Sequence, residues 1–251
     1  MPIRIYFLKR IVDLLVTLII WIYYILGFLL FFSPLYLAAF IFSSNREIAF
    51  QRLNNLYYRS FFCIVRAMVP GLKIRVQDAV TSIRSSVIVC NHLSYLDPIL
   101  LISLFPKHKT IVKGIFFKIP VFGWMLKTSG YIPSSVGGMA SSGIIENMER
   151  MGGYLSSGGN LFIFPEGTRS RNGKIGKFND GAFKIARRFG APITVLRIKN
   201  THNLFAPGKF LFNTCNPNTI ELRLIKDLNP DYKNDTFSIS GLVDQVRSLY
   251  I

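Results

Sequence analysis

The chain has 251 residues, half of them hydrophobic, with 30 Lys and Arg against 13 Asp and Glu, so its formal net charge is +17. This length suffices for one medium-sized domain and a smaller appendage. A basic excess of this size favours polyanionic partners, such as an anionic membrane surface, a phosphorylated substrate or nucleic acid. The aromatic residues lie mainly in apolar runs rather than between Lys and Arg, which argues against nucleic-acid binding.

Residues 14–42 carry no charge and are almost entirely apolar. As a helix this segment would extend about 43 Å, which exceeds the roughly 30 Å hydrocarbon core of a membrane. It is too long and too aromatic for a cleavable signal peptide, so it predicts a membrane anchor. Pro34 predicts a break or kink, and basic residues at both ends favour the same side of the membrane. We therefore expect a bent or re-entrant hairpin, with a single span as the alternative.

Residues 45–69 have the pattern of an amphipathic helix. Ser44 with Glu47 three positions later fits a capping box, and Pro70 ends the pattern. Apolar residues recur at steps of three and four, at Phe50, Leu53, Tyr57, Phe61, Ile64 and Met68, with Arg52, Arg59 and Arg66 on the opposite face. We expect a helix at the membrane interface, although a surface helix packed on a soluble core would show the same pattern. Residues 1–70 together form a predicted membrane-associated unit.

Over residues 71–251 the sequence pattern predicts short strands and helices instead of long helices. Strands are predicted at 72–76, 86–90, 110–113, 131–133, 161–164, 193–198 and 219–225. Helices are predicted at 98–103, 121–128, 139–156, 181–189 and 238–250. Their alternation indicates an α/β domain with a mixed sheet flanked by helices.

The first candidate site follows the strand at 86–90, where His92 and Asp97 are separated by four residues. A carboxylate beside an imidazole can fix its tautomer and stabilise the imidazolium, which makes the pair a candidate general base with its orienting partner. Taken alone, the pattern fits a structural role at least as well. Asp97 precedes a proline and could cap a helix, or Ser94 could be the cap with Asp97 at the third helical position. No Gly-x-Ser-x-Gly turn surrounds Ser94, so a serine nucleophile is disfavoured.

The second candidate site is Glu166-Gly167-Thr168-Arg169, which follows the strand at 161–164. Glycine lets backbone amides approach an anion closely, and the guanidinium of Arg169 offers a planar fork for phosphate. The alternative is a turn whose charges face water, and this applies most to the downstream cations Arg171, Lys174 and Lys177. Loops that follow strands gather at one edge of such a sheet, so we expect both sites to face one cleft.

The remaining histidines and the cysteines predict no metal site. His108 lies between Lys107 and Lys109 and is expected in an exposed loop, and His202 is expected to be structural. Cys63, Cys90 and Cys215 are widely spaced, which indicates a reducing compartment and apolar packing. No cluster has metal-ligand spacing, and there is no phosphate-binding P-loop. We therefore expect neither a metal nor a bound cofactor.

Three sequence motifs suggest a family. Asn91, His92, Ser94 and Asp97 match Asn-His-x-Ser-x-x-Asp, the His-x4-Asp motif, and residues 164–170 read Phe-Pro-Glu-Gly-Thr-Arg-Ser. Residues 191–195 form an apolar segment with Pro192. With these motifs and its hydrophobic N-terminus, the chain resembles the lysophosphatidate acyltransferase (PlsC-like) family of glycerolipid acyltransferases.

The resemblance implies a function and roles for these residues. His92 would be the general base on a glycerol hydroxyl, oriented by Asp97, and the hydroxyl would attack a thioester without an acyl-enzyme. Glu166, Gly167, Thr168 and Arg169 would bind the phosphate region of the acceptor, and Pro192 would shape the acyl or acceptor site. The expected reaction acylates the sn-2 hydroxyl of lysophosphatidic acid to phosphatidic acid. The co-substrate would be acyl-CoA or acyl-carrier protein, and the protein would lie at the cytoplasmic face of a bacterial inner membrane.

One family motif is altered here. Its pattern Gly-x-Ile-x-x-Asp-Arg aligns with Gly130-Tyr131-Ile132-Pro133-Ser134-Ser135-Val136, which places Ser135 and Val136 where Asp and Arg are usual. Lys113, Arg169 or Arg171 would have to replace the missing cation, or the acceptor is another lysolipid, such as a lysophospholipid or lyso-aminolipid. A non-catalytic module that binds anionic lipid is a further alternative, but such a module would need neither His92 nor Asp97.

Overall fold

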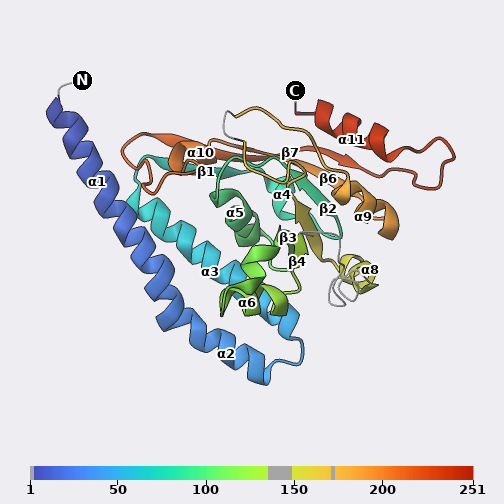
Figure 1. Ribbon diagram of the computed structural model, residues 1–251, viewed down its shortest axis with the longest axis horizontal. Coiled ribbons are helices and arrows are strands. Elements are labelled where there is room, and N and C mark those ends of the chain that lie inside the picture. Colours follow the sequence, from blue (N-terminus) through green and yellow to red (C-terminus); the bar gives the residue numbers. More distant parts are fainter. Residues whose placement is uncertain (1–2, 135–148, 171–172, 251) are drawn as a thin grey trace.

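The computed structural model describes residues 3–134, 149–170 and 173–250, and the side chains from residue 7 onwards. Its centre is a seven-stranded sheet in the order β1-β7-β6-β2-β5-β3-β4 (Figure 1). The strands are β1 Leu72–Val76, β2 Val87–Cys90, β3 His108–Lys113, β4 Ile132–Ser134, β5 Asn160–Ile163, β6 Ile193–Lys199 and β7 Asn218–Leu228. All neighbours pair in parallel except β6 and β7, so the sheet is mixed, as predicted.

The helices flank this sheet on both faces. In chain order they are α1 Ile3–Ile22, the π-helix η1 Tyr23–Phe32, α2 Ser33–Phe42, α3 Arg46–Met68, α4 Asp78–Thr81, α5 Leu96–Leu104, the 3₁₀-helix η2 Gly114–Lys118, α6 Phe122–Thr128, α8 Met151–Ser156, α9 Gly181–Phe189, α10 Thr201–Leu204 and α11 Ile239–Ser248. The helix predicted at 139–156 falls largely outside the described residues, and its described part contains α8. The short α4, η2 and α10 were not predicted, because two turns or fewer carry little periodicity.

Successive side chains of the central strands point to opposite faces of the sheet and contribute to two hydrophobic cores. Val87 and Val89 of β2 pack with α9 and α11, whereas Ile88 and Cys90 face the opposite core with α5. All four are buried because helices cover both faces of the strand, which explains why the sequence reads as a continuous apolar run. The same parallel arrangement brings the carboxyl ends of β2, β5 and β6 to one edge of the sheet.

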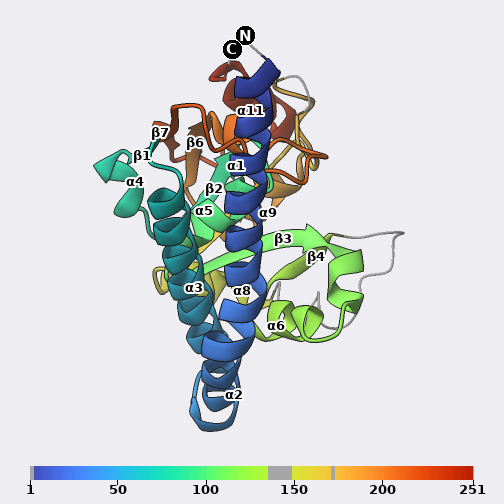
Figure 2. The same ribbon diagram turned by 90° about the vertical axis from the view of Figure 1, so that its left-hand side faces the viewer.

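The N-terminal helix is continuous from Ile3 to Phe42, so the hairpin predicted within residues 14–42 is wrong. The proline does not break the helix, because Pro34 occupies the first turn of α2, directly after the π-helical segment. The Ser33 hydroxyl donates to the Leu29 carbonyl at 2.6 Å within this junction. Residues Phe7–Phe42 form a helix long and apolar enough to cross a membrane. The chain reverses only at residues 43–45, and α3 then runs back beside α1 (Figure 2).

The start and the buried face of α3 also differ from expectation. Its N-cap is Asn45, whose Oδ1 accepts from the Ile48 amide at 3.0 Å, instead of the predicted Ser44. Glu47 is not part of a capping box, because its carboxylate pairs with the Lys109 ammonium at 2.9 Å. Lys109 is only 1% exposed, so this ion pair ties α3 to β3.

The body of the protein covers most of the face of α3 that was predicted to meet the membrane. Its buried residues include three polar side chains inside the apolar stripe: Gln51, Asn54 and Asn55. Each of these amides has hydrogen-bond partners in the body, including the Ser129 and Ile102 carbonyls. The predicted polar face is confirmed, since Arg52, Arg59 and Arg66 are exposed.

Two smaller expectations are also corrected. Of the three cysteines only Cys90 is buried, whereas Cys63 and Cys215 are exposed and free. His108 is not in an exposed loop but lies fully buried in β3. Its Nδ1 donates to the Phe105 carbonyl at 2.6 Å, and its Nε2 accepts from the Tyr131 hydroxyl at 2.5 Å. The lysines on either side of His108 suggested that it is exposed. One of them, Lys109, is itself buried, where it pairs with Glu47.

The buried His108 predicts a pH-dependent stability. Burial lowers the pKa of His108 from 6.5 to about 4. The imidazole of His108 binds a proton at higher pH in the unfolded chain than in the folded chain. The unfolding free energy therefore contains the full contribution of neutral His108 above about pH 6.5. This contribution is lost as the pH falls towards 4, by up to about 3 kcal/mol. In urea unfolding of detergent-solubilised protein, His108→Gln should remove this part of the acid destabilisation, while a His202→Gln control should retain it. Identical pH slopes for wild type and His108→Gln would contradict the assignment.

Candidate active site

The two loops singled out in the sequence meet at the carboxyl edge of the sheet. β2 and β5 are neighbours and run in parallel, with Ile88 opposite Phe162, so the chain leaves both strands at the same level. The Ser170 amide donates to the His92 carbonyl at 2.8 Å, which joins the loops directly. The expected common location is therefore confirmed.

His92 and Asp97 form a hydrogen-bonded pair. His92 Nδ1 lies 2.9 Å from Asp97 Oδ2, and because a carboxylate can only accept, a neutral imidazole carries its proton on Nδ1. The Phe164 ring stacks on the imidazole, with centroids 4.2 Å apart. No described residue hydrogen-bonds His92 Nε2. This nitrogen therefore keeps a lone pair, with the ring held from its edge and its face.

Asp97 is fully buried and organises the whole turn. Its Oδ2 also accepts from the amides of Leu93 at 2.5 Å and Ser94 at 2.7 Å. Asp97 lies in the first turn of α5 but is not its cap; its carboxylate reaches back to the preceding loop. Its Oδ1 is buried and has no partner among the described residues.

Glu166 supports the backbone of the site. Its Oε1 accepts from the His92 amide and its Oε2 from the Gly176 amide, both at 3.0 Å. The side chain is 9% exposed, so it is not oriented towards a ligand in the way the sequence suggested. Gly167 has φ +65°, where an L side chain is strained, and its amide closes the turn onto the Phe164 carbonyl at 3.0 Å.

The cations of the second loop differ in placement. The Arg169 guanidinium lies 3.3 Å from the centroid of the Tyr95 ring, a cation–π contact that fixes it beside the His92 turn. Thr168, Lys174 and Lys177 are exposed, and Arg171 falls outside the described residues.

Two other predicted site residues lie farther from His92. Lys113 ends β3 at the same edge of the sheet, but β5 separates that strand from β2. Pro192 immediately precedes β6, and its carbonyl accepts from the Val87 amide at 3.0 Å, at the amino end of β2. The length of β2, roughly 13 Å at 3.3 Å per residue, lies between this position and the His92 loop. Pro192 therefore does not shape the site near His92; it anchors the start of β6.

An apolar cavity of about 530 Å³ is lined in part by Tyr95, Leu96 and Pro98, the neighbours of the pair in sequence. Its walls come from α1, η1, α3, α5, η2 and α6, and Tyr95 and Leu96 connect it to the His92 turn. Cavities of this size bind small molecules and lipid chains. Among the lining residues the Asn54 amide donates to Ser129 Oγ at 3.0 Å and to the Tyr131 hydroxyl at 3.1 Å. These buried polar groups satisfy one another.

The comparisons with known proteins agree with this geometry. A family model described as Acyltransferase matches residues 71–199. A chloroplastic 1-acyl-sn-glycerol-3-phosphate acyltransferase of Brassica napus is 36% identical over 49% of this chain and 35% of its own length. The corresponding chloroplastic enzyme of Arabidopsis thaliana is 32% identical over 57% of this chain and 40% of its own. The crystal structure of the 1-acyl-sn-glycerophosphate acyltransferase PlsC from Thermotoga maritima superimposes with a TM-score of 0.71 at 21% identity, covering 96% of this chain and 95% of that one.

The fold and the matched region define the class: this chain belongs to the Acyltransferase family. The matched region contains both the His92 turn and the Glu166 loop. The two plant proteins are longer, and the chain matches 35% and 40% of their respective lengths. The likeness to the Thermotoga structure supports the fold, including the mixed sheet and the long N-terminal helix.

Sequence reasoning missed part of this site. Tyr95 and Phe205 carry no motif signal for a site, yet their rings lie 5.9 Å apart between the cavity and Arg169. Of the helices that line the cavity, the sequence identifies α1, η1 and α3 only as membrane or surface elements. The one signal available for the loop after Phe205 was Pro207-Gly208, a dipeptide typical of a turn. His202 is partly buried in α10, with an Nδ1 that has no partner among the described residues.

The position of Glu166 makes its role testable. In Glu166→Gln one of the two backbone amides loses its acceptor, because a side-chain amide has a single oxygen. We expect a loss of about 1–3 kcal/mol in unfolding free energy, measured by urea titration of the detergent-solubilised protein. A matched Asp180→Asn control, at an exposed carboxylate, should change little. Unchanged stability of Glu166→Gln would show that these two hydrogen bonds contribute little.

Proposed function

We propose that this protein is a 1-acyl-sn-glycerol-3-phosphate O-acyltransferase. It would transfer an acyl group from acyl-CoA or acyl-carrier protein to the sn-2 hydroxyl of lysophosphatidic acid. The observation that carries the proposal is a paired imidazole with an available Nε2, in a turn whose next residues, Tyr95 and Leu96, line an apolar cavity. The activity named for the two plant relatives supports the same substrate class.

The reaction needs one proton relay and no covalent enzyme intermediate. His92 Nε2 takes the proton of the acceptor hydroxyl as its oxygen attacks the thioester carbonyl carbon. The tetrahedral intermediate then expels the thiolate, which recovers the proton from the imidazolium. Asp97 holds the imidazole tautomer that leaves Nε2 unprotonated and stabilises the cation between the two steps.

The surroundings supply binding rather than further chemistry. A thioester is already activated, so positioning of the hydroxyl accounts for much of the expected acceleration. The cavity takes an acyl chain, and its volume of about 530 Å³ limits the length of that chain. Arg169 lies beside the turn, where the acceptor phosphate would be placed, and Lys113 contributes positive charge along the same edge.

The assignment of the pair predicts two graded losses of activity. His92→Ala should abolish acylation of lysophosphatidic acid, and Asp97→Asn should lower kcat by about 10²–10⁴-fold, because the wrong tautomer is favoured. Product formation from radiolabelled acyl-CoA and from acyl-carrier protein, with purified protein, measures both. His202→Ala is the matched control and should retain activity. Activity that survives in His92→Ala would exclude this residue as the base.

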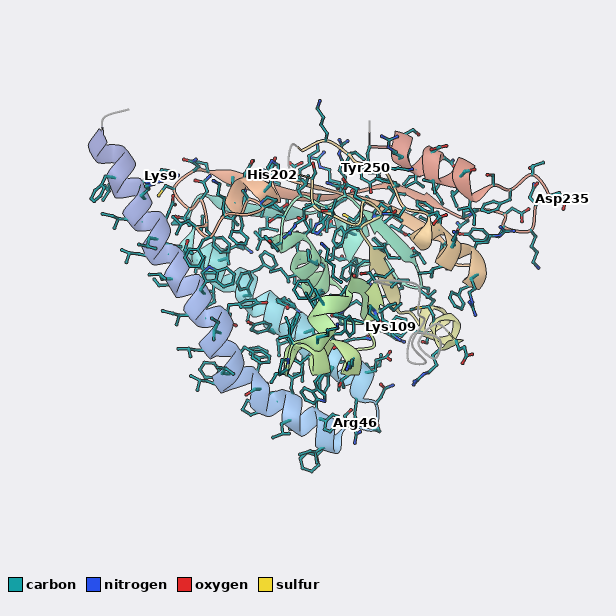
Figure 3. The ribbon with its side chains drawn as sticks, in the orientation of Figure 1. Lys9, Arg46, Lys109, His202, Asp235 and Tyr250 are labelled. Carbon is teal, nitrogen blue, oxygen red and sulfur yellow. The ribbon has the colours of Figure 1, made fainter. Side chains whose placement is uncertain are left out.

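The packing of the long N-terminal helix supports a protein that is attached to one side of a membrane and does not span it. One side is held along the body: Lys9 Nζ donates to Asn213 at 2.8 Å, Asp13 accepts from Thr214 at 2.7 Å, and Tyr36 donates to Asn54 at 2.5 Å. Because these contacts extend along most of its length, we infer that the helix stays packed on the body and does not cross the bilayer. Figure 3 shows side chains pointing outwards between the labelled Lys9 and Arg46.

The outward side is apolar and continues onto neighbouring elements. Exposed Leu, Ile and Phe residues lie along α1, η1 and α2. Ile115, Ile119 and Val121, in and after η2, are exposed as well and add to the apolar surface. We infer that this surface enters one leaflet at the cytoplasmic face, with the net charge of +17 favouring anionic lipid. Substrates would then reach the cavity from the membrane.

This placement predicts how the protein binds liposomes. Leu30→Glu with Phe31→Glu, both 66% exposed, should greatly weaken co-flotation with liposomes, because two charges would enter the hydrocarbon region. The wild type should bind better as anionic lipid increases and less well as salt increases. Asp235→Lys, in an exposed loop far from this helix, is the control. Unchanged flotation of the double variant would place the membrane surface elsewhere.

A further inference from the structure

The loop after α10 contains Lys209, which is one of the residues that line the cavity. Residues 206–209 form a tight turn in which Pro207 precedes Gly208, with φ +76° at the glycine, and the Lys209 amide donates to the Ala206 carbonyl at 3.2 Å. This pattern is a type II turn, which requires a residue that tolerates positive φ at its third position. α10 follows β6, the strand next to β2, so the turn lies at the carboxyl edge of the sheet.

Both ends of this turn are held by contacts with other elements. The Ser94 hydroxyl, which is fully buried, donates to the Phe205 carbonyl at 2.6 Å and so ties the turn to the His92 loop. On the other side the Phe210 ring stacks on Trp21 of α1, with centroids 6.3 Å apart. Lys209 is therefore positioned between the His92 loop and the membrane-facing helix.

Lys209 is the one charged side chain among the described residues that line the cavity. It is exposed, and its ammonium makes no hydrogen bond or ion pair with any other described residue. The rest of the lining is apolar, aromatic or uncharged polar. The ammonium is therefore available to an anionic ligand that occupies the cavity.

A second cation lies across the aromatic pair. Tyr95 and Phe205, whose rings lie 5.9 Å apart, both line the cavity, Arg169 stacks on Tyr95, and Lys209 follows Phe205 by four residues. A lipid whose acyl chain fills the cavity would have these two cations available for its anionic head group. The sequence also has Val136 where related motifs carry an arginine, which leaves the acceptor phosphate in need of a cation from elsewhere.

We propose that Lys209 binds the phosphate of the acceptor lysolipid, opposite Arg169, and selects anionic acceptors over neutral ones. The proposal rests on the proposed function and adds a specificity-determining residue to it. An ammonium acts as a point charge and does not require the bidentate geometry of a guanidinium. The mobile head of a lipid in a membrane can therefore be captured without a rigid fork.

Steady-state kinetics of the full-length protein in mixed micelles test this proposal. Lys209→Ala should raise KM for lysophosphatidic acid about tenfold, equivalent to about 1.4 kcal/mol, with kcat within about twofold and KM for acyl-CoA unchanged. KM for a neutral 1-acylglycerol should not change, and Lys209→Arg should recover most of the selectivity. Lys226→Ala, which removes an exposed positive charge from β7, is the matched control and should resemble wild type.

Three results would overturn the proposal: an unchanged KM for lysophosphatidic acid, an equal loss with the neutral acceptor, or a raised KM for acyl-CoA in place of the acceptor. A binding measurement separates this proposal from the proposed activity. In a His92→Ala background, Trp21 fluorescence reports occupancy of the cavity that it lines. Lys209→Ala should weaken binding of lysophosphatidic acid about tenfold in that background. This result would support Lys209 even if the wild type acylated no lysophosphatidic acid, an outcome that would refute only the proposed activity.

Discussion

The site depends on a single carboxylate oxygen that accepts three hydrogen bonds. Asp97 Oδ2 receives the Leu93 and Ser94 amides and the imidazole of His92, so it fixes the backbone of the turn and the ring together. Buried amides need acceptors, and removing this one would leave two of them unsatisfied. Asp97 does not cap α5; the same oxygen organises the preceding turn and orients the imidazole ring.

A second constraint is a set of buried polar side chains on α3. A helix that only covered a core would bury apolar residues, but Gln51, Asn54 and Asn55 are buried and bonded to the Ser129 carbonyl, the Ser129 hydroxyl and the Ile102 carbonyl. These bonds fix the register of α3 against α5 and α6, because a rotation or shift would leave the amides unpaired. Asn54 and its partner Ser129 also line the cavity, so the packing of α3 and the shape of the cavity are set together.

Much of the sheet could be predicted from the sequence. Seven strand predictions correspond to the seven observed strands, because buried parallel strands appear as short apolar runs between turn residues. The meeting of the His92 and Glu166 loops also followed from the sequence, since both loops leave the carboxyl ends of strands.

Tertiary contacts decided the features that the sequence did not reveal. Lys109 and His108 appear to be loop residues until Glu47 and Tyr131 provide buried partners from other elements. Pro34 reads as a helix breaker because the π-helical segment before it has no sequence signature of its own. Glu166 resembles a ligand-binding carboxylate, but the amides of His92 and Gly176 use both of its oxygens.

The N-terminal helix separates the cavity from its exterior by a single layer. Ile20 and Trp21 face inwards and line the cavity, whereas their neighbours Ile19 and Ile22 are about half exposed on the outer side. A lipid chain inside and the chains of the surrounding bilayer would thus lie one helix diameter apart, about 10 Å. Bilayer thickness and fluidity would act directly on a wall of the cavity, so the acyl preference measured in a short-chain detergent need not equal that in a native membrane.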